Sequence, residues 1–170
     1  ALASLAGERM FFDGDNSSGV SGDLESATTI ASFMEGHWGM GSTVSSHASN
    51  RRNEVGAPGV GKGKDDSGKE IRVALADRIE NNLSSLLNRA EVILRENKNK
   101  VLALAHALEV NKTMTGDDVK AVLNFEAGPL IDGRPYGNEE NIAAIVRYHE
   151  AAVIAHKEHK KPEISLPAIK

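Results

Sequence analysis

The chain has 170 residues, a formal net charge of −4 and no cysteine. A chain of this length forms one domain, with room for a short appendage. The acidic balance argues against nucleic acid as a partner, because proteins that bind nucleic acid usually present a basic face. Without cysteine there can be no disulfide framework and no thiolate metal site, so any metal would be held by histidine and carboxylate side chains.

The composition favours an all-α fold. Only 4% of the residues are aromatic and five are proline, whereas alanine and leucine, which favour helices, are plentiful. No apolar run approaches the roughly 20 residues that a membrane-spanning helix needs. We therefore expect a helical domain with no membrane segment in this chain.

Two helices are predicted near the start of the chain. Residues 2–12 carry apolar side chains on one side, and a turn at residues 14–16 ends that helix. Asp23 then begins a second helix, which Gly39 ends. The inward face of this helix is predicted from residues that recur at helical spacing: Leu24, Ala27, Thr28, Ala31, Met34 and Trp38.

Residues 41–68 are rich in glycine and serine and predict a long flexible loop. Inside it, residues 56–62 match the first seven positions of a phosphate-binding P-loop. Gly63, however, stands where that motif needs a serine or threonine to hold magnesium, and the pattern shows no strand before it or helix after it. We interpret the segment as a linker; a nucleotide-binding role for Lys62 is the weaker alternative.

A long central helix is predicted from Lys69 to Asn97, because isoleucine and leucine residues recur at intervals of three and four. After a break at residues 97–100 the pattern resumes from Val101 to Glu109. A capping-box-like start at residues 115–118 predicts a short helix that ends at Asn124.

A last helix is predicted after a run of turn residues. Asn138 caps it, acidic residues occupy its first turn and lysines its end, and Pro162 stops it.

The histidines do not form a recognisable zinc motif. A thermolysin-like zinc protease needs His-Glu-x-x-His on a helix. The one His-Glu pair is His149–Glu150, and its second histidine would fall at Val153. His156 lies two helical turns from His149, too far for both to bind one metal. We interpret His149 and His156 as packing residues.

We interpret two other histidines as residues without a catalytic or metal-binding role. His106, among alanine and leucine residues, is predicted to be a partly buried structural residue. His159 lies three residues after His156 and could share a metal with it, but the neighbouring lysines favour a solvated helix end.

Asp23 is the remaining candidate for chemistry. Aspartate is a preferred residue at helix N-termini, so capping alone could explain its presence.

Residues 18–41, SGVSGDLESATTIASFMEGHWGMG, resemble a segment of the FtsH-type ATP-dependent zinc metalloproteases. That segment reads T/S-G-A-x-N-D-L-x-x-A-T-x-x-A-x-x-M-V-x-x-x-G-M-S. The matching residues are Ser18, Gly19, Asp23, Leu24, Ala27, Thr28, Ala31, Met34, Gly39 and Met40.

The resemblance extends over residues 5–123. Upstream, Leu5, Gly7 and Arg9 resemble the family's L-x-G-R-x-A-E helix, imperfectly. Downstream, the family's long helix is matched either by Asn88 and Arg89 or by Glu96, Asn97 and Lys98. The matches that follow are Leu104, Ala105, Leu108, Thr113, Gly116 and Val119. The loop at 41–68 and the last forty or so residues have no counterpart. The resemblance therefore implies two parts: the C-terminal part of an FtsH-like peptidase domain at residues 1–124, and a tail at residues 125–170.

The resemblance implies a role for Asp23 as the third protein ligand of a catalytic zinc. It also implies a parent enzyme that degrades unfolded or membrane-associated proteins, works as a homo-hexamer on the cytoplasmic side of a membrane and uses ATP in a separate ATPase domain. The sequence departs from the family in having Gly22 where the asparagine before the aspartate is expected, and in lacking His-Glu-x-x-His. We therefore expect the chain alone to be inactive.

A non-catalytic helical assembly or adaptor domain is the alternative. The stripe of Ile142, Val146, His149 and Val153 on the last helix would then be its interaction surface.

Overall fold

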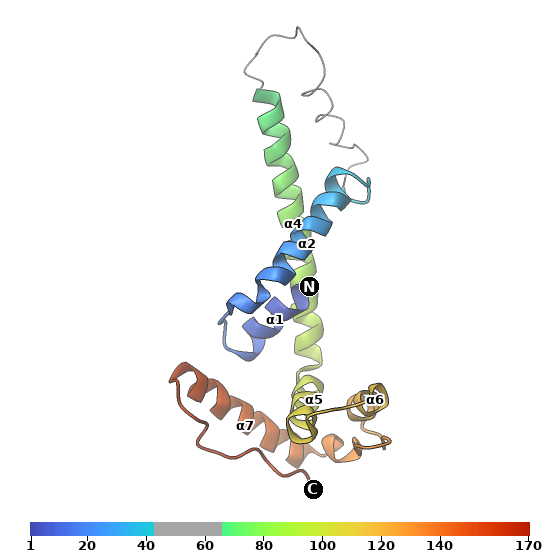
Figure 1. Ribbon diagram of the computed structural model, residues 1–170, viewed down its shortest axis with the longest axis vertical. Coiled ribbons are helices and arrows are strands. Elements are labelled where there is room, and N and C mark those ends of the chain that lie inside the picture. Colours follow the sequence, from blue (N-terminus) through green and yellow to red (C-terminus); the bar gives the residue numbers. More distant parts are fainter. Residues whose placement is uncertain (43–65) are drawn as a thin grey trace. The chain divides into compact units, whose positions relative to one another are not determined.

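A computed structural model describes residues 1–42 and 66–170, with side chains in the second range from residue 73 onward (Figure 1). This part of the chain contains six α-helices, two short 3-10 helices and an isolated β-bridge, but no strand, so the expected all-α class is confirmed. None of its helices combines the length and the apolar character that crossing a membrane requires. Residues 43–65, which include most of the predicted flexible loop and all of its P-loop-like segment, lie outside the described residues. At the ends of the predicted loop, residues 41–42 are described and residues 66–68 already belong to a helix.

The chain divides into two compact units. The first comprises Ala1–Arg9 and Gly14–Val92, and the second comprises Met10–Asp13 and Ile93–Lys170.

The first unit contains α1 (Leu2–Phe11), a 3-10 helix η1 (Ser18–Val20), α2 (Ser21–Gly36) and most of α4 (Asp66–Glu96). These bounds agree with the predicted helices to within about three residues. Among the described residues of this unit, the buried apolar side chains are Leu5, Ala6, Val20, Ala27 and Ala31.

Three residues assigned to the inward face of α2 lie at the surface instead: Leu24, Thr28 and Trp38. Leu24 is 36% exposed, and Trp38, which follows the helix, is 55% exposed and stacks on Phe33 with ring centroids 5.5 Å apart. The helical period fails for Trp38 because α2 ends at Gly36, two residues before it.

A buried carboxylate ties α2 to α4. Glu35 is 3% exposed and lies 3.6 Å from the guanidinium of Arg78. It also accepts hydrogen bonds from the Asn82 side chain and from the backbone and hydroxyl of Ser42. A side chain at Gly41 would overlap this carboxylate, since a Cβ there would lie 2.2 Å from Glu35 Cδ. Glu35 is therefore satisfied by several donors, as a buried charge must be.

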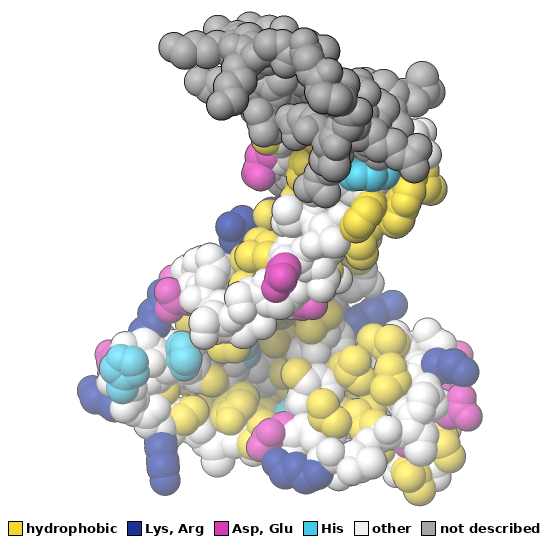
Figure 2. Space-filling model, turned by 45° about the horizontal axis from the view of Figure 1, so that its top comes forward, with side chains coloured by type: hydrophobic (Ala, Val, Ile, Leu, Met, Phe, Trp, Pro, Cys, Tyr) yellow, Lys and Arg dark blue, Asp and Glu magenta, His cyan; other side chains and the backbone are white. Residues whose placement is uncertain are grey.

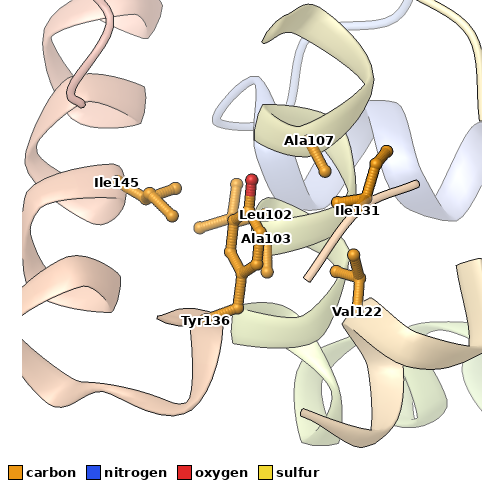
Figure 3. Close-up of a cluster of buried hydrophobic side chains, with 7 residues drawn as sticks. All are labelled: Leu102, Ala103, Ala107, Val122, Ile131, Tyr136 and Ile145. Carbon is orange, nitrogen blue, oxygen red and sulfur yellow. The ribbon is translucent and has the colours of Figure 1, made fainter. Parts of the chain in front are cut away.

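The second unit is built from α5 (Lys98–Asn111), α6 (Gly116–Asn124), a 3-10 helix η2 (Arg134–Gly137) and α7 (Glu139–Lys157). The predicted break before α5 is narrower than expected, because only Asn97 leaves the helical conformation. Figure 3 shows how α5, α6, the following turn and α7 converge on one apolar core: Leu102, Ala103, Ala107, Val122, Ile131, Tyr136 and Ile145.

Asp118 organises the start of α6 and the turn that follows it. The predicted capping box is present: Thr115 caps the helix, and its backbone N–H and hydroxyl donate to Asp118 at 2.9 and 2.6 Å. The other oxygen of this fully buried carboxylate accepts from the backbone N–H groups of Leu130 and Ile131. One ionised side chain thus satisfies donors from two separate segments.

We predict that this network makes stability depend on acid pH. The hydrogen bond from the Thr115 hydroxyl has the largest effect and lowers the pKa of Asp118. The backbone N–H groups of Thr115, Leu130 and Ile131 lower it further, to about 2 from 3.8, against the opposing effect of burial. A depressed folded-state pKa contributes stability that is fully present above the unfolded value and is lost as the pH falls toward 2. Thermal unfolding should therefore show Asp118→Asn well below wild type at neutral pH and close to it near pH 2. A difference that does not change with pH would contradict this assignment.

We also predict that position 133 must be glycine, because the fold leaves no space for a side chain there. A Cβ there would lie 2.1 Å from the backbone oxygen of Ala121, and backbone cannot move aside cheaply. Gly133→Ala should lower the free energy of unfolding by about 3 kcal/mol, the upper part of the usual range for overpacking. Gly116→Ala is the matched control, because no atom lies within 4 Å of its added Cβ. Equal urea midpoints for the two variants would refute the prediction.

Candidate functional site

Asp23 lies in the first turn of α2, where its side chain is exposed. The chain enters α2 through η1, whose first turn is capped by Ser17: the hydroxyl of Ser17 accepts from the backbone N–H of Gly19 at 3.1 Å. A negative charge at this end of a helix is favourable, because the helix dipole places partial positive charge there.

The carboxylate of Asp23 is bonded by a side chain from another helix. The hydroxyl of Ser4, in α1, donates to Asp23 Oδ2 at 2.6 Å. The residue at the N-cap position of α2 is Val20, and no side chain caps this helix. Within the described residues, the bond from Ser4 is the hydrogen bond that the Asp23 carboxylate receives. No side chain caps α2, but Asp23 stands in its first turn, where the helix dipole favours its charge, so the structural alternative for Asp23 stays open.

A second pair of hydrogen bonds holds the connection between α1 and α2. The backbone N–H and the hydroxyl of Ser17 both donate to the Glu8 carboxylate, at 2.5 and 2.7 Å. These bonds, the backbone one first, lower the pKa of Glu8. These bonds join α1, in which Leu5 and Ala6 are buried, to the residue just before η1.

Zinc, which the resemblance implies, can be tested against the residues present. A catalytic zinc site takes three protein ligands and keeps one open position. Among the described residues, no group of three or more His, Asp, Glu or Cys side chains is close enough to hold a metal. Asp23 fits as a single oxygen ligand: its carboxylate is exposed, and one oxygen is held by Ser4. The described residues thus hold no complete zinc site.

The histidine of α5 has a structural role, as predicted. His106 is 5% exposed, and its two ring nitrogens lie 2.9 Å from the Tyr136 hydroxyl and 2.8 Å from the backbone oxygen of Pro167. Because a carbonyl can only accept, Nε2 carries the proton in the neutral ring and Nδ1 accepts from the tyrosine. His106 therefore ties the last residues of the chain to the core.

The histidines of α7 pack against the end of α1. His149 meets Phe11 edge-on at a centroid distance of 5.7 Å, and His156 meets Phe12 at 5.6 Å. Burial, followed by the charge of Lys98, lowers the pKa of His149. A lowered pKa favours the neutral ring, which suits an aromatic contact.

Sequence reasoning found Asp23 but missed Ser4 and the Glu8–Ser17 pair. Ser17 carries a local signal, since serine before a helical turn is a common cap. The contacts that join α1 to α2 span 19 residues for Ser4 and nine for Glu8, and helical periodicity carries no signal for them.

Comparison with known proteins identifies one family and three relatives. The model of peptidase family M41 matches residues 1–122. The chain is similar to the ATP-dependent zinc metalloprotease YME1L of Drosophila melanogaster, with 38% identity over 124 residues, 72% of this chain and 16% of that protein. It is also similar to the ATP-dependent zinc metalloprotease FtsH of Pelobacter propionicus, with 30% identity over 136 residues, 76% of this chain and 21% of that protein.

A third relative is the ATP-dependent zinc metalloprotease FtsH 2 of Symbiobacterium thermophilum, with 28% identity over 123 residues, 72% of this chain and 20% of that protein. The chain thus spans only 16–21% of the length of these three proteins. No solved structure matches it. Because the family model covers well over half of the sequence, the chain belongs to peptidase family M41.

Proposed function

We propose that this chain is part of an ATP-dependent zinc metalloendopeptidase and that Asp23 supplies the third protein ligand of its catalytic zinc. The observation that carries the proposal is the placement of Asp23: an exposed carboxylate at the start of α2, bonded by a side chain and not by the helix amides. The similarity to three proteins named as ATP-dependent zinc metalloproteases supports it.

The remaining ligands come from outside these 170 residues in this proposal, because the sequence contains no His-Glu-x-x-His. A zinc ion held by Asp23 and those ligands would supply a water molecule with a pKa of about 7 and a Lewis acid for the peptide carbonyl. Asp23 contributes an anionic oxygen from a helix start whose direction α1 fixes. By itself the chain would be inactive.

The substrates we propose are unfolded or membrane-associated proteins, and the assembly we propose is a homo-hexamer on the cytoplasmic side of a membrane. ATP would bind to an ATPase domain elsewhere in the protein. Residues 1–124 would belong to the peptidase domain, followed by a tail at 125–170. Ile30, Trp38, Met40 and Leu130 are each more than half exposed, and we take this exposed apolar surface as support for burial in an assembly. Figure 2 shows hydrophobic side chains, in yellow, on the face of the molecule that it draws.

The test is Asp23→Asn in the whole protein that contains this chain. Asparagine keeps the size of the side chain but removes the charge that zinc prefers in an oxygen ligand. We expect zinc affinity to fall by more than about 100-fold, since even partners outside the ligand set contribute 10–100-fold. Proteolysis of casein should be lost, while far-ultraviolet circular dichroism stays unchanged.

Glu25→Gln is the matched control, because it removes an exposed carboxylate two residues further along α2. It should keep wild-type zinc content and proteolysis. If Asp23→Asn bound zinc as wild type does, the ligand assignment would be wrong, and a non-catalytic assembly domain would become the better account.

A further inference from the structure

We propose that Ser4 is a positioning residue for Asp23: its hydroxyl holds one carboxylate oxygen so that the other is presented to zinc. This inference rests on the proposed function, in which Asp23 is a zinc ligand. It concerns a side chain that the sequence resemblance does not single out.

The distance between the two side chains is that of a strong hydrogen bond. Ser4 Oγ lies 2.6 Å from Asp23 Oδ2, within the 2.5–2.7 Å range of a hydroxyl bonded to an ionised carboxylate. The backbone oxygen of Ala1 is also in reach, at 2.7 Å. A hydroxyl has only one proton to donate, and the charged carboxylate is the stronger acceptor. The Ser4 hydroxyl therefore donates its hydrogen bond to Asp23 and not to the backbone oxygen of Ala1.

The hydrogen bond from Ser4 restricts the rotation of the Asp23 carboxylate before zinc binds. Without the bond, this rotational freedom would be lost only on binding, which would weaken the affinity. Rotation of an aspartate carboxylate about its last torsion is broad and roughly two-fold, so an unheld carboxylate presents either oxygen in many directions. Ser4 fixes Oδ2. In the described part of the chain, the hydrogen bond to this carboxylate goes to Oδ2, so Oδ1 is the oxygen that we assign to the metal.

The helix that carries Ser4, α1, is held in place by buried side chains and by hydrogen bonds. The next two residues of α1, Leu5 and Ala6, are 6% and 0% exposed. One turn further, Glu8 accepts two hydrogen bonds from Ser17, just before η1. The hydroxyl therefore projects from a helix that is anchored both by burial and by bonds to the segment leading into α2. A donor held in this way can orient its acceptor.

The experiment compares Ser4→Ala and Ser4→Thr in the whole protein. Zinc affinity is measured by competition with a chelator, and the ligand field by the visible spectrum of the cobalt(II)-substituted protein. Removing a partner that orients a ligand typically weakens metal binding 10–100-fold, so Ser4→Ala should raise the zinc dissociation constant by about that factor and alter the cobalt spectrum. Ser4→Thr keeps a hydroxyl and should restore both.

Ser32→Ala is the matched control, since Ser32 is a helical serine whose hydroxyl donates to the backbone oxygen of Thr28 instead. It should leave zinc affinity unchanged. The unfolding midpoint of the zinc-free protein separates orientation from folding. Alanine favours helices more than serine does, so Ser4→Ala should not lower this midpoint.

Wild-type zinc affinity in Ser4→Ala would overturn the role of Ser4, and weakened binding in Asp23→Asn would then still support the proposed function. If Asp23→Asn also bound zinc normally, both proposals would fall. A loss of zinc affinity in Ser4→Ala that matched a lower zinc-free midpoint, without rescue by threonine, would mean that the bond only stabilises the fold. That result would also overturn the inference.

Discussion

Hydrogen bonds between α1 and the start of α2 decide where Asp23 points. Ser17 donates twice to Glu8, and nearby Ser4 donates to Asp23. These contacts cross a connection rich in small polar residues, which has little apolar surface with which to order itself. The candidate ligand thus depends on polar bonds between two helices, and the burial of Leu5 and Ala6 keeps α1 in place.

The second unit is held differently, by an apolar core joined to a buried carboxylate. The family match ends at residue 122, yet the segment beyond it supplies Ile131, Tyr136 and Ile145 to a core that also contains Leu102 and Ala103 of α5. His106 then fastens the end of the chain through Pro167. Residues 125–170 therefore pack as part of the same unit as the last helices of the family match.

The helices could be predicted because their signals are local. Periodicity located α4, and the capping box at Thr115 located the start of α6. The hydrogen-bonding partners of the polar residues could not be predicted, because they lie at distant positions in the sequence. Glu35 stands after Met34, where the family pattern has valine. No local sequence signal predicts that Arg78 and Asn82 are its partners. The resemblance proposed Asp23 as a ligand, and this stays a prediction; the Ser4 contact became visible only in the fold.

The central claim is that Asp23 binds zinc through the oxygen that Ser4 leaves open. The most direct measurement is a crystal structure of the whole zinc-loaded protein, with the metal located by its anomalous scattering. Our account predicts zinc about 2.0–2.2 Å from Asp23 Oδ1, with the Ser4 hydroxyl still bonded to Oδ2. Zinc bound elsewhere, with the Asp23 carboxylate outside its coordination sphere, would contradict it.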